Sequence, residues 1–85
     1  MSGEVSGMVE RADPITANQG AERLKVPPSR IYVWAHRYNA RKVRRGRTVY
    51  YDWHDLKTIA RYIRVGESVP PTPEERDELR RRTAA

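Results

Sequence analysis

The first apolar stretch with helical spacing begins just after residue 16 of the 85-residue chain. Thr16 and Gln19 match a capping box, in which each side chain accepts a hydrogen bond from the backbone N–H of the other residue. The helix must end before Pro27, because proline disfavours helical geometry in the residue that precedes it. Its apolar face consists of Ala17, Ala21 and Leu24. The pattern therefore predicts a short amphipathic helix.

A second helix is predicted to start at Pro28, because the missing N–H of proline costs nothing at the first helical position. Its apolar residues recur at the spacing of a buried stripe: Ile31, Trp34, Ala35 and Tyr38. The opposite face is mostly polar and basic: Ser29, Arg30, Val33, His36 and Arg37. Two short helices about three residues apart predict a helix-turn-helix.

A β-hairpin is predicted next, after Asn39 ends the second helix in left-handed geometry. Two β-prone stretches flank Arg45-Gly46, which predicts the turn there, and Val49 and Tyr51 share one face. The tip is strongly basic and has no acid beside it: Arg44, Arg45 and Arg47. This pattern is typical of a basic wing.

A third amphipathic helix is predicted to begin after Asp52, which caps it, while Asp55 complements the helix dipole. Gly66 ends this helix. Its apolar stripe consists of Trp53, Leu56, Ile59, Ala60 and Ile63. The expected core of the fold comprises Leu24, Val26, Ile31, Trp34, Tyr38, Val49, Tyr51, Trp53, Leu56, Ile59 and Ile63.

These elements predict a mainly α fold with a small β-hairpin, a winged helix-turn-helix domain over residues 15–66. Residues 1–14 contain few apolar side chains and are predicted to form a disordered arm. Residues 67–85 are predicted to form a proline-rich linker and a short helix over residues 73–83. Leu79 is the only large apolar residue of that helix, so the pattern leaves open whether the helix docks or frays.

The charge of the chain is concentrated in its centre. The net charge is +6, but residues 15–65 hold twelve Lys and Arg against three acids. Six of the eleven residues from 37 to 47 are Lys or Arg. Such a block favours an anionic partner, and double-stranded DNA is the one we expect. The alternative is a solvated basic face.

Other chemistries find little support in the composition. The chain has no Cys, which excludes disulfides and thiolate metal sites, and no apolar run approaches the roughly 20 residues of a membrane span. No Gly-rich phosphate loop is present, and His36 and His54 are the only histidines. We therefore expect a soluble cytoplasmic, nucleoid-associated protein that is not an enzyme, has no cofactor or metal and does not bind a membrane.

The candidate DNA contacts follow from the two basic surfaces. Arg30 and Arg37 lie where a recognition helix would read guanine, or where they would contact phosphates only. Ser29, near the helix N-terminus, is a candidate phosphate contact. Arginines of a hairpin tip gain from the negative potential of a narrow minor groove. The full candidate set is Ser29, Arg30, Val33, His36, Arg37, Arg41, Lys42, Arg44, Arg45 and Arg47.

Several of these segments together resemble the small winged helix-turn-helix proteins of the MerR-like superfamily, and most closely the phage and plasmid excisionases. The matching residues are Thr16, Ala21, Leu24-Lys25-Val26, Ile31-Tyr32-Val33-Trp34, Arg44-Arg45-Gly46-Arg47 and Asp55-Leu56. Lys25 stands where the family pattern has glycine, which predicts a looser turn between the helices. The segment 39–42 lacks the glycine that usually precedes the wing.

The resemblance implies a DNA-binding and DNA-bending accessory factor from a bacterial or phage source. Its second helix would enter the major groove, and its wing would grip the minor groove or the backbone. Copies would bind head to tail near attachment sites and direct a partner tyrosine or serine integrase towards excision. A small transcriptional regulator is the first alternative. The second is an interaction protein of DNA packaging or assembly, with the helix at 73–83 as the partner-binding element.

Overall fold

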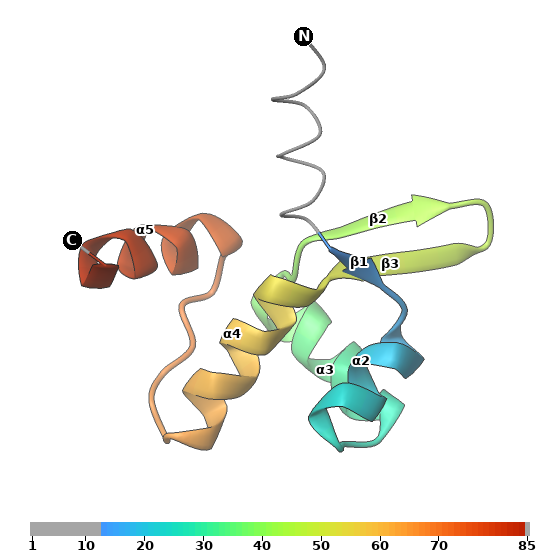
Figure 1. Ribbon diagram of the computed structural model, residues 1–85, viewed down its shortest axis with the longest axis horizontal. Helices are drawn as coiled ribbons and strands as arrows, with labels where there is room; N and C mark the ends of the chain where they lie inside the picture. The colour runs from blue at the N-terminus through green and yellow to red at the C-terminus, as the bar shows by residue number, and fades with distance from the viewer. Residues whose placement is uncertain (1–12, 85) are drawn as a thin grey trace, which may run out of the picture.

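The computed structural model describes residues 13–84 (Figure 1). These residues form four helices and one three-stranded antiparallel sheet, so the fold is mostly helical. In chain order the elements are β1 (Pro14–Ile15), α2 (Ala17–Leu24), α3 (Pro28–Tyr38), β2 (Lys42–Arg45), β3 (Thr48–Asp52), α4 (Trp53–Arg64) and α5 (Pro73–Ala84). The predicted arm lies outside the described residues except for Asp13 and Pro14, and Pro14 belongs to a strand.

The capping box of α2 is confirmed. The Thr16 hydroxyl oxygen accepts the Gln19 N–H at 3.1 Å, and Gln19 Oε1 accepts the Thr16 N–H at 2.9 Å. At the other end, Lys25 takes a left-handed φ of 59° and Val26 N–H bonds back to Ala21 O at 3.0 Å. Lysine here adopts the conformation that glycine reaches without strain, so the predicted loosening of the turn is wrong.

The hairpin is confirmed, with its turn one residue later than predicted. Arg45 pairs with Thr48, so the two turn residues are Gly46 and Arg47, and Gly46 has a positive φ of 62°. The sheet order is β1-β3-β2, with Ile15 of β1 opposite Tyr51 of β3. The sequence pattern did not predict β1, because two residues are too few to show strand alternation.

The core lies between α2, α3, α4 and the inner face of the sheet. Its buried apolar residues are Ile15, Ala17, Ala21, Ile31, Trp34, Ala35, Ala40, Tyr51, Leu56 and Ile59. Five residues of the expected core are only partly buried, namely Leu24, Val26, Tyr38, Val49 and Trp53. The prediction for Ile63 is wrong, because it lies in the last turn of α4, beyond the packed part of that helix, and is 37% exposed.

Small residues let α2 approach α4 closely. A Cβ atom on Gly20 would lie 3.2 Å from Leu56 Cδ1 and 3.3 Å from Ile15 Cδ1, closer than most real Cβ contacts. Gly20 thus permits α2 to pack directly against Ile15 and Leu56.

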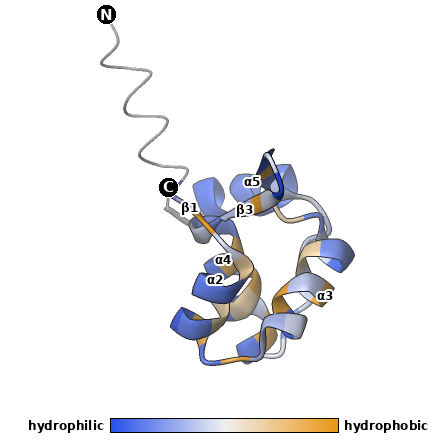
Figure 2. Ribbon diagram, turned by 90° about the vertical axis from the view of Figure 1, so that its right-hand side faces the viewer, coloured by the Kyte–Doolittle hydropathy of each residue, from blue (hydrophilic) through white to orange (hydrophobic). Residues whose placement is uncertain are grey.

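The last helix docks on the domain through a buried ion pair. The Arg76 side chain is 1% exposed. It donates two hydrogen bonds to the Asp55 carboxylate, Nε to Oδ1 at 2.6 Å and Nη2 to Oδ2 at 2.7 Å. Arg76 Nη1 donates to the carbonyls of Tyr38 and Pro70 at 2.9 and 2.7 Å. The sequence left the docking of this helix open, and the structure shows that the helix docks, with the buried Arg76 side chain at the contact. Apart from this contact α5 is largely hydrophilic (Figure 2).

Asp55 lies in the first turn of α4, as expected for an acid that complements the helix dipole, and it makes further contacts. Besides gripping Arg76, its Oδ2 accepts the backbone N–H of Arg41 at 2.9 Å. Asp52, in contrast, caps α4 as predicted, accepting the His54 N–H at 3.2 Å. Asp55 therefore joins α4 to the base of β2 and to α5, which dipole complementarity alone would not do. No helix formed by the described residues is long and apolar enough to cross a membrane.

Candidate nucleic-acid interface

The outer face of α3 presents the side chains that the helical pattern predicted. Ile31 and Trp34 are 0% and 8% exposed on the inner side. The outward residues are all exposed, including the apolar Val33 at 49%: Ser29, Arg30, Val33, His36 and Arg37. Because the buried stripe fixes the rotation of α3, these five side chains form one continuous surface along the helix.

The hairpin carries the second group of predicted contacts. It extends away from the helices, and its tip lies on the opposite side of α4 from α5 (Figure 1). Its four candidate cations are exposed: Lys42, Arg44, Arg45 and Arg47. In the strand register Arg44 lies opposite Val49 and Arg45 opposite Thr48, so these two arginines point to different faces of the hairpin.

The cations of both elements lack carboxylate partners. In residues 13–82, no Asp or Glu forms an ion pair with any of the following side chains: Arg30, Arg37, Lys42, Arg44, Arg45 and Arg47. Four of the nine acids of residues 13–84 lie on α5, namely Glu74, Glu75, Asp77 and Glu78. The charge of α3 and the hairpin is therefore uncompensated within the described part of the molecule.

Arg41 was predicted to contact DNA, but in the structure its side chain is bound to α5. Its guanidinium forms an ion pair with Asp77 of α5 at 2.8 Å. The hydrogen bond that Arg41 donates to the Asp77 carboxylate raises the pKa of Arg41. Burial alone would raise the pKa of Asp77, but the hydrogen bonds and charges of Arg41 and Arg80 outweigh it and lower that pKa. Arg41 thus links the base of the hairpin to α5 instead of joining the exposed cations.

Two further groups of exposed residues were not among the predicted contacts. Val43, 47% exposed, lies opposite Tyr50 on the hairpin, and the alternation of strand residues could have indicated it. On α4, Lys57, Arg61 and Arg64 are exposed at spacings of four and three residues. That spacing is visible in the sequence, but the denser basic block of residues 37–47 is the more prominent signal.

Comparison with family models, with curated proteins and with solved structures finds no match. The argument for function therefore rests on the surface itself. In the part of the chain that the structure describes, no group of three or more His, Cys, Asp or Glu residues could hold a metal ion. What the surface offers is a row of guanidinium groups, a helix of groove-filling width and a projecting hairpin, an arrangement suited to a polyanion.

Proposed function

We propose that the chain is a DNA-binding protein of the winged helix-turn-helix type, with α3 as the recognition helix and the β2–β3 hairpin as the wing. The observation that carries the proposal is the exposure of two basic elements without carboxylate partners among the described residues. Unpaired arginines at this density repel one another, and phosphates relieve that repulsion.

The dimensions of α3 support placement in the major groove, which is about 12 Å wide and admits one helix. Arg30 and Arg37 are seven residues apart on the same face, about 10 Å along the axis. Two such arginines reach base edges or phosphates in successive positions of the groove. Ser29 lies in the first turn of α3, where backbone N–H groups point towards an anion.

The buried ion pair of α5 supports a fixed angle between the two binding elements. Arg76 holds Tyr38 at the end of α3, and Asp55 holds Arg41 at the start of β2. Asn39, between them, takes a left-handed φ of 53°, and its side chain donates to Pro71 O at 3.1 Å. A recognition helix and a wing must be held in register to engage adjacent grooves, and these contacts provide that constraint.

Within this class we infer the role of an excisionase-type accessory factor. It would bind cooperatively near attachment sites, bend the DNA and direct a partner integrase towards excision. The support is the resemblance carried by Thr16, residues 24–26, residues 31–34 and the Arg44–Arg47 tip.

The removal of α5 would leave the Asp55 carboxylate without Arg76, so truncation before this helix would test folding rather than partner binding.

The experiment that tests this role is a footprint and a circular-permutation gel shift on DNA carrying an attachment site. The wild-type chain is expected to protect several adjacent sites and to bend the DNA. The variant Arg45→Gln/Arg47→Gln is expected to lose both effects. Its matched control is Arg81→Gln/Arg82→Gln, which removes the same charge from exposed positions of α5. A single isolated footprint without a bend would contradict the accessory role and favour the transcriptional regulator.

A further inference from the structure

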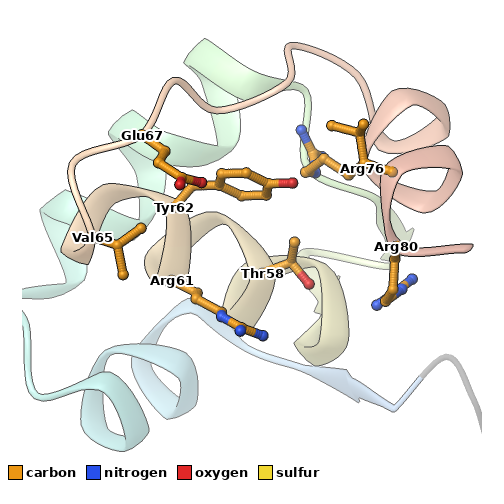
Figure 3. Close-up of a pocket in the computed structure, with 8 residues that line it drawn as sticks. Thr58, Arg61, Tyr62, Val65, Glu67, Arg76 and Arg80 are labelled. Atoms are coloured by element: carbon orange, nitrogen blue, oxygen red, sulfur yellow. The ribbon is translucent and has the colours of Figure 1, made fainter. Parts of the chain in front are cut away.

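A second basic surface lies on the side of the fold formed by α2, α4 and α5. An open groove there is lined by five basic side chains and no acidic one: His54, Lys57, Arg61, Arg64 and Arg80. Lys57, Arg61 and Arg64 project from α4, while Arg80 comes from α5. Figure 3, a view of the neighbouring pocket between α4 and α5, shows Arg61 and Arg80 on either side of Thr58, and all three residues also line this groove. We call this surface the α4 groove.

The α4 groove is separate from the proposed recognition surface. None of the outward residues of α3 and none of the hairpin residues line it. In Figure 2, α3 lies on one side of the fold, with α2 and α4 towards the other. A duplex held by α3 and the hairpin would therefore leave this groove open.

The cations of the groove are largely uncompensated. Arg80 forms an ion pair with Asp77 at 2.7 Å, but no carboxylate of residues 13–82 pairs with Lys57, Arg61 or Arg64. Like charges at i,i+4 and i,i+3 on a helix repel, and these three residues have that spacing. Lys57 is held over the ring of Trp53, with Nζ 5.8 Å from the ring centroid, which fixes its stem near the groove.

The lining of the groove favours nucleic acid over a protein partner. Protein interfaces depend on buried aromatic and aliphatic anchors at their centre. Here the apolar lining is limited to Leu24 and Ala60, both already half-buried in the fold. The more exposed apolar side chains, Val65 and Leu79, line a neighbouring pocket between α4 and α5. Phosphate contacts need only the cations.

We propose that the α4 groove binds the sugar–phosphate backbone of a second DNA segment while α3 and the hairpin hold the first. This inference rests on the proposed function. Lys57 and Arg64 are seven positions apart, about 10 Å along α4, enough to contact more than one phosphate of a strand. One copy of the chain then bridges two segments of duplex, without need of a second copy.

A bridging assay with the full chain tests the proposal. One duplex is immobilised, a fluorescent duplex of the same sequence is added, and its capture is measured as a function of protein concentration. The test variant is Arg61→Gln/Arg64→Gln, and Arg81→Gln/Arg82→Gln is the control with the same change of charge. Removal of two phosphate contacts at 0.1 M salt lowers affinity by about 60-fold. Capture is therefore expected to fall by about 10-fold or more in the test variant only, with its affinity for a single duplex within about threefold of wild type.

The other outcomes separate the two proposals. If the wild-type chain binds one duplex but never captures the second, the bridging inference is overturned and the proposed function stands. Equal capture by the test variant and the wild type would assign bridging to self-association and overturn the inference. Capture blocked by polyglutamate at a lower charge concentration than by unlabelled duplex would assign the groove to an acidic protein. If the wild-type chain binds no duplex, the proposed function itself fails.

Discussion

The buried pair Arg76–Asp55 should be the most sensitive point of the fold. In the variant Arg76→Ala, the Asp55 carboxylate, 3% exposed, keeps only the Arg41 N–H as a hydrogen-bond donor. The carbonyls of Tyr38 and Pro70 lose their donor as well. Removal of one partner of a buried pair costs about 3–5 kcal/mol, a large fraction of the stability of a domain of this size.

Two further variants separate the ion pair from the space it fills. Arg76→Lys keeps the charge but lacks the planar fork that meets both carboxylate oxygens, so it should recover only part of the loss. The double variant Asp55→Asn/Arg76→Gln removes both charges. Its loss of stability should be smaller than the sum of the losses in Asp55→Asn alone and Arg76→Gln alone. Arg82→Ala, at a side chain that is 70% exposed, is the control and should change stability by less than about 0.5 kcal/mol.

The measurement is urea unfolding followed by circular dichroism and by the combined fluorescence of Trp34, which is 8% exposed, and the partly buried Trp53. Arg76→Ala should lower the midpoint strongly in both signals, because Arg76 also holds the end of α3 on which Trp34 lies. A loss below about 1 kcal/mol would refute the reasoning. It would mean that α5 is not fixed to the domain through this pair.

Three smaller effects follow from the same structure. Lys25→Gly should raise the free energy of unfolding by about 0.5–1 kcal/mol in a urea titration, because glycine relieves the left-handed strain at φ 59° at some cost in unfolded-state entropy; a loss would contradict this. Asp77→Asn should destabilise the chain at pH 7, because the lowered pKa of Asp77 contributes stability that is lost as pH falls below its ordinary pKa of 3.8. Asp52→Asn should instead stabilise the chain at pH 7. Burial raises the pKa of Asp52, so its ionised form costs stability above pH 3.8, whereas asparagine is uncharged and keeps the cap. Unfolding midpoints measured from pH 7 down to pH 3 should show both differences shrinking, and differences as large at pH 3 as at pH 7 would count against the assignments.

The elements predicted well are those set by residues close in sequence. The Thr16–Gln19 capping box and the left-handed Asn39 depend on neighbours within a few positions. The prediction of the outward face of α3 is confirmed, because the buried stripe of Ile31 and Trp34 fixes the rotation of the helix. Such local signals also place the hairpin, although the turn shifted by one residue.

The features that sequence patterns missed depend on distant pairs. Asp55 and Arg76 are 21 positions apart, and Asp55 already has a local explanation as an acid in the first turn of α4. An arginine that is 1% exposed also runs against any search for a core based on apolar residues. The pairing of Arg41 with Asp77 follows from that docking, so a candidate DNA contact could not be separated from a structural one.

The salt dependence of DNA binding tests the central claim most directly. Fluorescence anisotropy with a labelled duplex, from low to moderate salt, gives the slope of log affinity against log salt. About five phosphate contacts predict a slope of roughly −4 to −5, and each lost contact should reduce its magnitude by about 0.9. Arg45→Gln/Arg47→Gln should therefore flatten the slope by about 1.8, while Arg81→Gln/Arg82→Gln should leave it unchanged. No binding at low salt, or an equal slope for the hairpin variant and the control, would contradict the account.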